Sequence, residues 1–157
     1  MVEIKTFIKI NESFILIDNF KNKIKDADYI EGAIELNIYG NKIINLEMWD
    51  LIDQLWAYLI NGLVIVYKEN KKLFSTFFPD QPIKIQYKYM NESLLLIQVF
   101  LNDKVNSIQV EKKEFLKEII EKGKLFFEKL ISIVPQNKKN YNVYLNHLIE
   151  LEEYIRK

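Results

Sequence analysis

Two aspartates, Asp50 and Asp53, stand three residues apart at the start of an amphipathic segment. Carboxylates at this spacing lie on one side of a helix, where they can share a metal ion or divide the roles of general acid and general base. The indole of Trp49 beside them suits the wall of a small-molecule pocket. Both aspartates are also typical of the solvent-facing side of a helix near its N-terminal end. Because no third metal ligand can be identified, the sequence favours this second interpretation.

Asp80 is another candidate, since it lies between two prolines in the segment Pro79-Asp80-Gln81-Pro82. Prolines interrupt strand pairing, so this segment is predicted to form a loop that could display the carboxylate to a ligand or a partner. An aspartate at such a place is also common in tight turns, where its side chain accepts a hydrogen bond from the nearby backbone. The turn is the favoured interpretation, and a binding role stays the alternative.

A third set of candidates consists of Glu31, Glu35 and Tyr39, which alternate with apolar residues along a predicted strand. Alternation places them together on the face opposite the apolar side chains. Residues 1–50 hold 6 Lys against 9 acidic residues, a local balance of −3. Carboxylates beside an aromatic anchor suit a basic patch on a partner protein, and a solubilising outer sheet face is the alternative.

Most other catalytic constellations lack their residues. The chain has no Cys, and its single histidine, His147, lies in a C-terminal segment that contains no serine or aspartate. Its four glycines are isolated from one another, so no glycine-rich phosphate loop is available. The only arginine, Arg156, is the penultimate residue. We therefore expect a non-catalytic protein with no cofactor and no metal.

The composition indicates an ordinary globular domain spanning residues 1–157. Hydrophobic residues make up 49% and charged residues 28%, and 22 basic residues balance 22 acidic ones. A net charge of zero argues against nucleic acid and acidic membranes as partners, and no apolar run is long enough to span a bilayer. The N-terminus resembles no signal peptide, so the cytoplasm is the expected compartment. The abundance of Ile (24), Lys (21) and Asn (15) indicates an AT-rich, bacterial genome.

The elements that position these residues follow from the hydrophobic period. Residues 1–46 alternate as strands, with a hairpin turn predicted at Gly40-Asn41. Residues 47–61 change to a period of about 3.6, which predicts a helix capped by Asn45 and stopped at Asn61-Gly62. Its apolar face includes Trp49 and Trp56, which we expect to be buried against the sheet. Residues 63–68 are predicted as a strand, with a continued helix as the alternative.

Strands and turns continue to residue 110 as a meander, and two amphipathic helices follow at 115–134 and 141–155. Strands in runs followed by helices indicate an α+β fold. We predict an antiparallel β-sheet of hairpins and a meander, with one central helix and two C-terminal helices packed on one face.

Two segments carry a resemblance to known proteins, Trp49–Gly62 and Phe74–Ile83. Both look like blocks in a group of uncharacterised small bacterial single-domain proteins. In size and α+β layout, these proteins resemble the immunity proteins of bacterial toxin systems. The resemblance implies a chain that masks a partner toxin, and it assigns a role to no individual residue. Many immunity proteins that neutralise nucleases are acidic, whereas this chain is neutral.

The sequence as a whole predicts a non-catalytic protein-binding domain of the immunity type. Another protein is the expected partner, and a homodimer is the alternative assembly. The alternative function is a small-molecule-binding protein or a minor hydrolase that uses the Asp50–Asp53 pair near Trp49.

Overall fold

The N-terminal strands form the first antiparallel sheet, because their apolar residues alternate with polar ones. The computed structural model describes residues 1–157 and places β1 (Val2–Ile10) at the centre of this sheet. Its neighbours are β2 (Ser13–Leu16) and β3 (Glu31–Ile38), and β3 pairs in turn with β4 (Asn41–Ile44) and the short β5 (Asp50–Leu51). The buried face of β1 and β3 supplies one side of the core.

The β3–β4 hairpin forms as predicted, but its turn lies one residue earlier. Tyr39 and Gly40 occupy the two central positions with φ angles of +52° and +84°. A two-residue turn with positive φ at both positions matches the right-handed twist of the strands. The predicted pair Gly40-Asn41 is therefore wrong by one position, since Asn41 already belongs to β4.

The central helix, α1 (Ile52–Leu63), begins later and ends later than the period predicts. Asn45 accepts a hydrogen bond from the Glu47 N–H, as a cap does, but it caps only a short 3-10 turn at Leu46–Met48. Gly62 does not stop the helix but lies inside it. A Cβ at this position would lie 2.5 Å from the Phe74 ring. Close packing of helix on sheet, rather than a turn, explains this glycine.

The strand predicted at residues 63–68 is wrong, and the alternative of a continued helix is right. Val64–Lys68 continues α1 as a π-helical turn. The wider π turn changes the angle between successive side chains. Val66 and Tyr67 of this turn are buried in the core.

The second sheet is the predicted meander of four antiparallel strands. Its order follows the sequence: β6 (Leu73–Phe77), β7 (Ile83–Tyr89), β8 (Leu94–Leu101) and β9 (Lys104–Glu111). β8 is an interior strand, which agrees with its nearly continuous apolar sequence. The strands thus divide between two sheets, which share one hydrophobic core.

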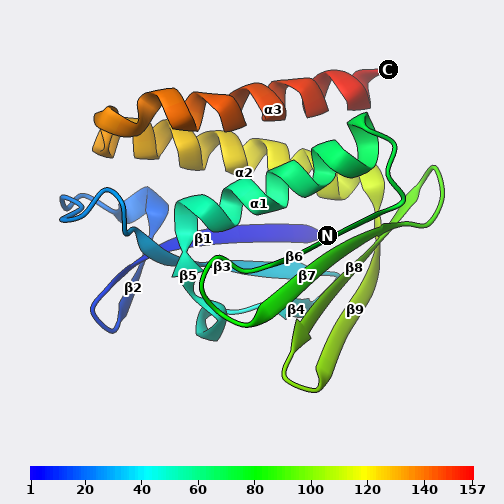
Figure 1. Ribbon diagram of the computed structural model, residues 1–157, viewed down its shortest axis with the longest axis horizontal. Helices are drawn as coiled ribbons and strands as arrows, with labels where there is room; N and C mark the ends of the chain where they lie inside the picture. The colour runs from blue at the N-terminus through cyan, green and yellow to red at the C-terminus, as the bar shows by residue number, and fades with distance from the viewer.

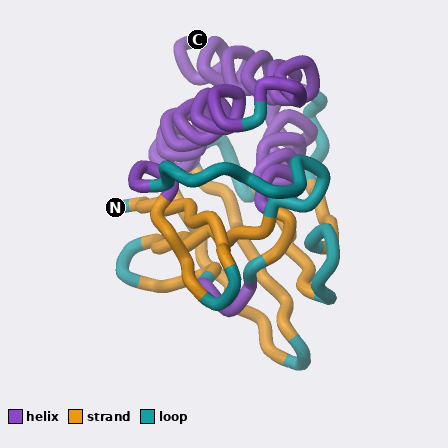
Figure 2. Tube along the Cα trace, turned by 90° about the vertical axis from the view of Figure 1, so that its left-hand side faces the viewer, coloured by secondary structure: helices purple, strands orange, loops and turns teal.

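The C-terminal helices α2 (Lys112–Ile133) and α3 (Lys138–Arg156) pack against each other and close the core from above. Figure 2 shows the long helices gathered on the same side of the strands. The protein is therefore an α+β fold with a central helix and two C-terminal helices, as predicted. None of these helices combines the length and apolar character needed to cross a membrane.

The two tryptophans differ in their surroundings. Trp56 of α1 is fully buried between helix and sheet, as predicted, and its indole N–H donates to Thr6 Oγ1 at 3.0 Å. Trp49 precedes the helix and is only half-buried, with Lys9 Nζ lying 4.3 Å from the ring centroid. The prediction that Trp49 is also a core residue of the helix is wrong, because the chain is extended there and pairs with β3.

Candidate functional site

Asp50 is not on a solvent-facing helix surface, and that prediction is wrong. It lies in β5, where its side chain is 2% exposed. Its Oδ2 accepts hydrogen bonds from the backbone N–H groups of Asp80 and Gln81, at 3.1 and 2.9 Å. The Gln81 side-chain amide in turn donates to the carbonyl of Trp49. Asp50 therefore ties the first sheet to the loop between β6 and β7.

Asp53, in the first turn of α1, has a different set of partners. Its Oδ2 accepts from the Tyr141 hydroxyl of α3 at 2.9 Å, and its Oδ1 accepts from the Gln54 N–H. The predicted pair of aspartates therefore has no partner in common. Asp80 remains exposed in its loop, and only its backbone contacts Asp50.

The predicted binding residues on and after β3 are Glu31, Glu35 and Tyr39. Two of them, Glu35 and Tyr39, form contacts with other residues of the chain. Glu35 forms an ion pair with Lys42 at 3.2 Å. The Tyr39 hydroxyl accepts a hydrogen bond from the Glu111 N–H at 3.1 Å and lies 3.4 Å from Glu114 Oε2. Glu31 is half-buried. Tyr39 thus helps to hold the N-terminal end of α2 against the first sheet.

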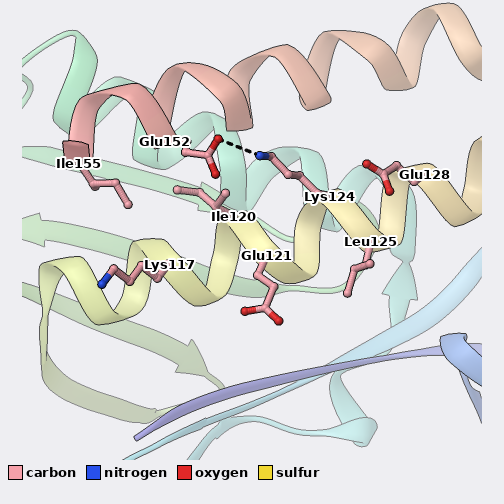
Figure 3. A pocket seen from close by; sticks show the side chains of 8 residues that line it. All are labelled: Lys117, Ile120, Glu121, Lys124, Leu125, Glu128, Glu152 and Ile155. Atoms are coloured by element: carbon pink, nitrogen blue, oxygen red, sulfur yellow. Dashed lines mark hydrogen bonds and ion pairs between the residues drawn. The ribbon is translucent and has the colours of Figure 1, made fainter. Parts of the chain in front are cut away.

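A groove of about 560 Å³ runs between α2 and α3. Figure 3 shows that Lys124 and Glu152 meet across it, at 3.1 Å, while Glu121 and Leu125 point away from α3. Arg156 also approaches Glu152, at 3.6 Å. The Lys124–Glu152 pair occupies the two charged groups that meet in the groove, whereas the remaining charged lining residues form no ion pair across it: Lys117, Glu121 and Glu128.

The outer face of the second sheet is a further candidate surface. The strand register places twelve side chains on it in three rows of four across β6, β7, β8 and β9. The rows are Phe77–Lys84–Phe100–Val105, Ser75–Gln86–Gln98–Ser107 and Leu73–Lys88–Leu96–Gln109. We call these residues the meander face.

Charge is segregated on the meander face. Lys84 and Lys88 are its only charged residues, although acids and bases balance over the whole chain. The nearest acid in register is Glu111 at the end of β9, which accepts the Glu114 N–H and so caps α2. The twelve residues of the meander face are therefore positively charged and include no carboxylate, and the adjoining row contributes the single carboxylate of Glu111.

Large apolar side chains are exposed on the strands to either side of the two lysines. Phe77 is 61% exposed, Leu73 51% and Val105 50%. Lys84 Nζ lies 4.4 Å from the Phe100 ring centroid, a cation–π contact that holds the lysine flat on the sheet. In the middle row, Gln86 donates to Gln98 at 2.8 Å, and Gln98 donates to Ser107 at 3.0 Å. These contacts fix the Lys84, Gln86 and Gln98 side chains against their neighbours on the face.

The sequence contains a signal for the meander face in the alternation of Lys84, Gln86 and Lys88 with Ile85 and Tyr87. Tyr87 is buried, and its hydroxyl donates to the Leu59 carbonyl, so the tyrosine faces the core and the lysines face outward. The sequence of the neighbouring strands adds no acid before Glu111. Which of their side chains share a face with the two lysines depends on the register of the four strands.

Comparison with protein-family models, with curated proteins and with solved structures finds no match to this chain. No group of three or more His, Asp or Glu side chains is placed to hold a metal ion. The functional argument therefore rests on the surfaces and pockets of this chain itself.

One prediction concerns Asp53, whose pKa is raised mainly by burial. A carboxyl that holds its proton more tightly in the folded chain loses stability as the pH rises from the ordinary aspartate pKa through the folded-state pKa. Asp53→Asn keeps an oxygen for the Tyr141 hydroxyl and carries no charge. We expect the variant to melt at an equal or higher temperature than the wild type at about pH 7.5, with the difference shrinking towards about pH 4.

Thermal melts of both proteins at the two pH values test this expectation. A variant that melts well below the wild type at neutral pH would show that the Asp53 charge stabilises the fold.

Proposed function

We propose that this chain is a non-catalytic protein-binding domain that docks a partner on its meander face. The observation that carries the proposal is the combination of exposed apolar side chains with lysines and no carboxylate on that face. The partner surface that fits it is acidic and offers a hollow for an apolar anchor.

The apolar side chains supply the attraction. Phe77 and Leu73 stand on β6, at the edge of the sheet, where a partner can surround them. Desolvated aromatic anchors of this kind dominate interface energies, whereas charges at the rim mainly affect the association rate and selectivity. Lys84 and Lys88 would therefore select an acidic partner and speed its capture.

The same charges make other occupants less suitable. A second copy docked face to face would bring lysines of one copy against lysines of the other, without carboxylates to pair with them. Nucleic acid would find two lysines and no arginine on the face, too few cations for firm binding to a phosphate backbone. An acidic protein is the partner to which we commit.

The resemblance to immunity proteins suggests that this partner is a bacterial toxin. A positively charged face suits a toxin whose exposed surface is acidic, rather than one with a basic nucleic-acid-binding cleft. In this proposal the domain acts by covering the toxin, and none of its own side chains performs chemistry.

The test is affinity capture from lysate of the source cell with three proteins. These are the wild type, the charge-reversed variant Lys84→Glu/Lys88→Glu, and the control Lys113→Glu/Lys139→Glu. The control changes the net charge by the same amount at exposed helix positions that form no ion pair. Circular dichroism establishes that all three are folded.

We expect one acidic protein to be retained in stoichiometric amount by the wild type and by the control. Its affinity should fall at least about tenfold for the charge-reversed variant and should weaken with added salt. Equal retention by all three proteins, or retention of no protein, would contradict the proposal.

A further inference from the structure

A separate pocket of about 270 Å³ lies where α1, α3 and the loop before β3 meet. Figure 1 shows these three segments at the same end of the molecule. Its lining includes Asp28 and Asp53 together with Tyr58, Tyr141 and Tyr144. We call it the tyrosine pocket, and it shares no residue with the meander face.

The charged residues that line the tyrosine pocket are both acidic. Neither Asp28 nor Asp53 takes part in an ion pair. The only other charge that affects the pKa of Asp53 is Asp28, which has the same sign. An uncompensated carboxylate in a partly buried site is costly, and a bound cation would relieve that cost.

Asp53 retains the capacity to accept a further contact. A carboxylate has about four acceptor positions, and only the Tyr141 hydroxyl and the Gln54 N–H occupy two of them. The Tyr141 hydroxyl is itself fixed, because it also accepts from Asn137 Nδ2 at 3.2 Å. The same Asn137 amide donates to the Ala27 carbonyl at 3.1 Å, which ties the loop to α3. The carboxylate is thus held in position without its charge being neutralised.

Two of the tyrosine rings that line the pocket pack against a phenylalanine of the core. The buried ring of Phe127 stacks on Tyr144, with centroids 5.4 Å apart, and contacts Tyr141 at 5.5 Å. Asp53 and Tyr58 both lie near enough to Tyr144 to contribute to the raised pKa of its hydroxyl, although burial is the main cause. Tyr141 and Tyr144 are therefore held in place beside Asp53, and Tyr58 and the exposed Asp28 complete the lining.

We propose that the tyrosine pocket binds a small methylated ammonium cation. The faces of aromatic rings attract such cations, and a desolvated carboxylate adds the opposite charge. The volume is slightly below that of sites for drug-sized ligands, so the ligand is small. A calcium ion would require six or more oxygen ligands, which this lining does not bring together.

Calorimetric titration with choline tests the proposal, with 3,3-dimethyl-1-butanol as the neutral molecule of the same shape. We expect choline to bind at least about tenfold more tightly than the alcohol. Asp53→Asn, which keeps the hydrogen bond from Tyr141, should weaken choline binding about tenfold. Tyr144→Leu should weaken it as well, whereas Tyr144→Phe, which keeps the ring, should bind nearly as the wild type does.

A methylated ammonium group can belong to a free small molecule or to a modified lysine of a protein. Titration with N-acetyl-trimethyllysine amide separates these sources, and tighter binding of either probe assigns the site to that source. Equal affinity for choline and the alcohol, no binding of any cation, or unchanged choline affinity in Asp53→Asn would overturn the proposal. The experiment requires no protein partner, so its result is independent of docking on the meander face.

Discussion

Replacing Trp56 with Ala is expected to lower the free energy of unfolding by about 3–5 kcal/mol, because it removes a large, fully buried side chain. The indole connects three elements. It belongs to α1, it donates to Thr6 of β1, and it stacks on Phe126 of α2 with centroids 5.7 Å apart. The change therefore leaves a cavity at the meeting point of helix and sheet, with the Thr6 hydroxyl deprived of its donor.

Chemical denaturation followed by circular dichroism measures this loss. Trp49→Ala is the matched control, since Trp49 is half-buried and contacts Lys9 at the surface. We expect the control to lose less than half as much stability as Trp56→Ala. Equal losses from the two changes would mean that Trp56 is not the packing centre that the structure describes.

Asp50→Ala is expected to cost about 3 kcal/mol, an unusual amount for an aspartate. The reason is that its carboxylate accepts the backbone N–H groups of Asp80 and Gln81 from a buried position. Without the carboxylate, these donors lose a charged acceptor, and the loop between β6 and β7 loses its attachment to β5.

Asp50→Asn keeps one oxygen for those donors and should lose less stability than Asp50→Ala. Asp80→Ala is the control, because the exposed Asp80 side chain forms none of these contacts. Urea denaturation of the three variants compares them directly. If Asp50→Ala unfolded at the same urea concentration as the wild type, Asp50 would behave as a solvated surface residue that does not stabilise the fold.

The spacing of hydrophobic residues along the chain predicted most of the fold. Strand alternation and the apolar stripes of α2 and α3 depend only on residues that are close in the sequence. It failed where long-range contacts override the local pattern. Trp49 and Asp50 fit a helical period, but pairing with β3 holds that segment extended. Gly62 looks like a helix stop, but the Phe74 ring requires a residue without a Cβ inside the helix.

The candidate sites were less predictable, because each is assembled from segments far apart in the sequence. Asp53 was chosen for its distance from Asp50, yet its actual partner, Tyr141, lies 88 residues away. The sequence already shows that these strands hold no acid before Glu111, but only the register of β6 to β9 shows which of their side chains share one face. Spacing along the chain identifies residues with suitable chemistry, and the fold decides which of them meet.

The central claim, that a partner docks on the meander face, is tested most directly by hydroxyl-radical footprinting of the protein alone and in complex with its captured partner. This method measures how accessible each side chain is to solvent. The account predicts that Phe77, Leu73 and Met90, which is exposed at the end of β7, become protected in the complex. Met1 and Leu125, which are also exposed, should keep their reactivity. Protection of Met1 or Leu125 with unchanged reactivity of Phe77 and Met90 would contradict the account.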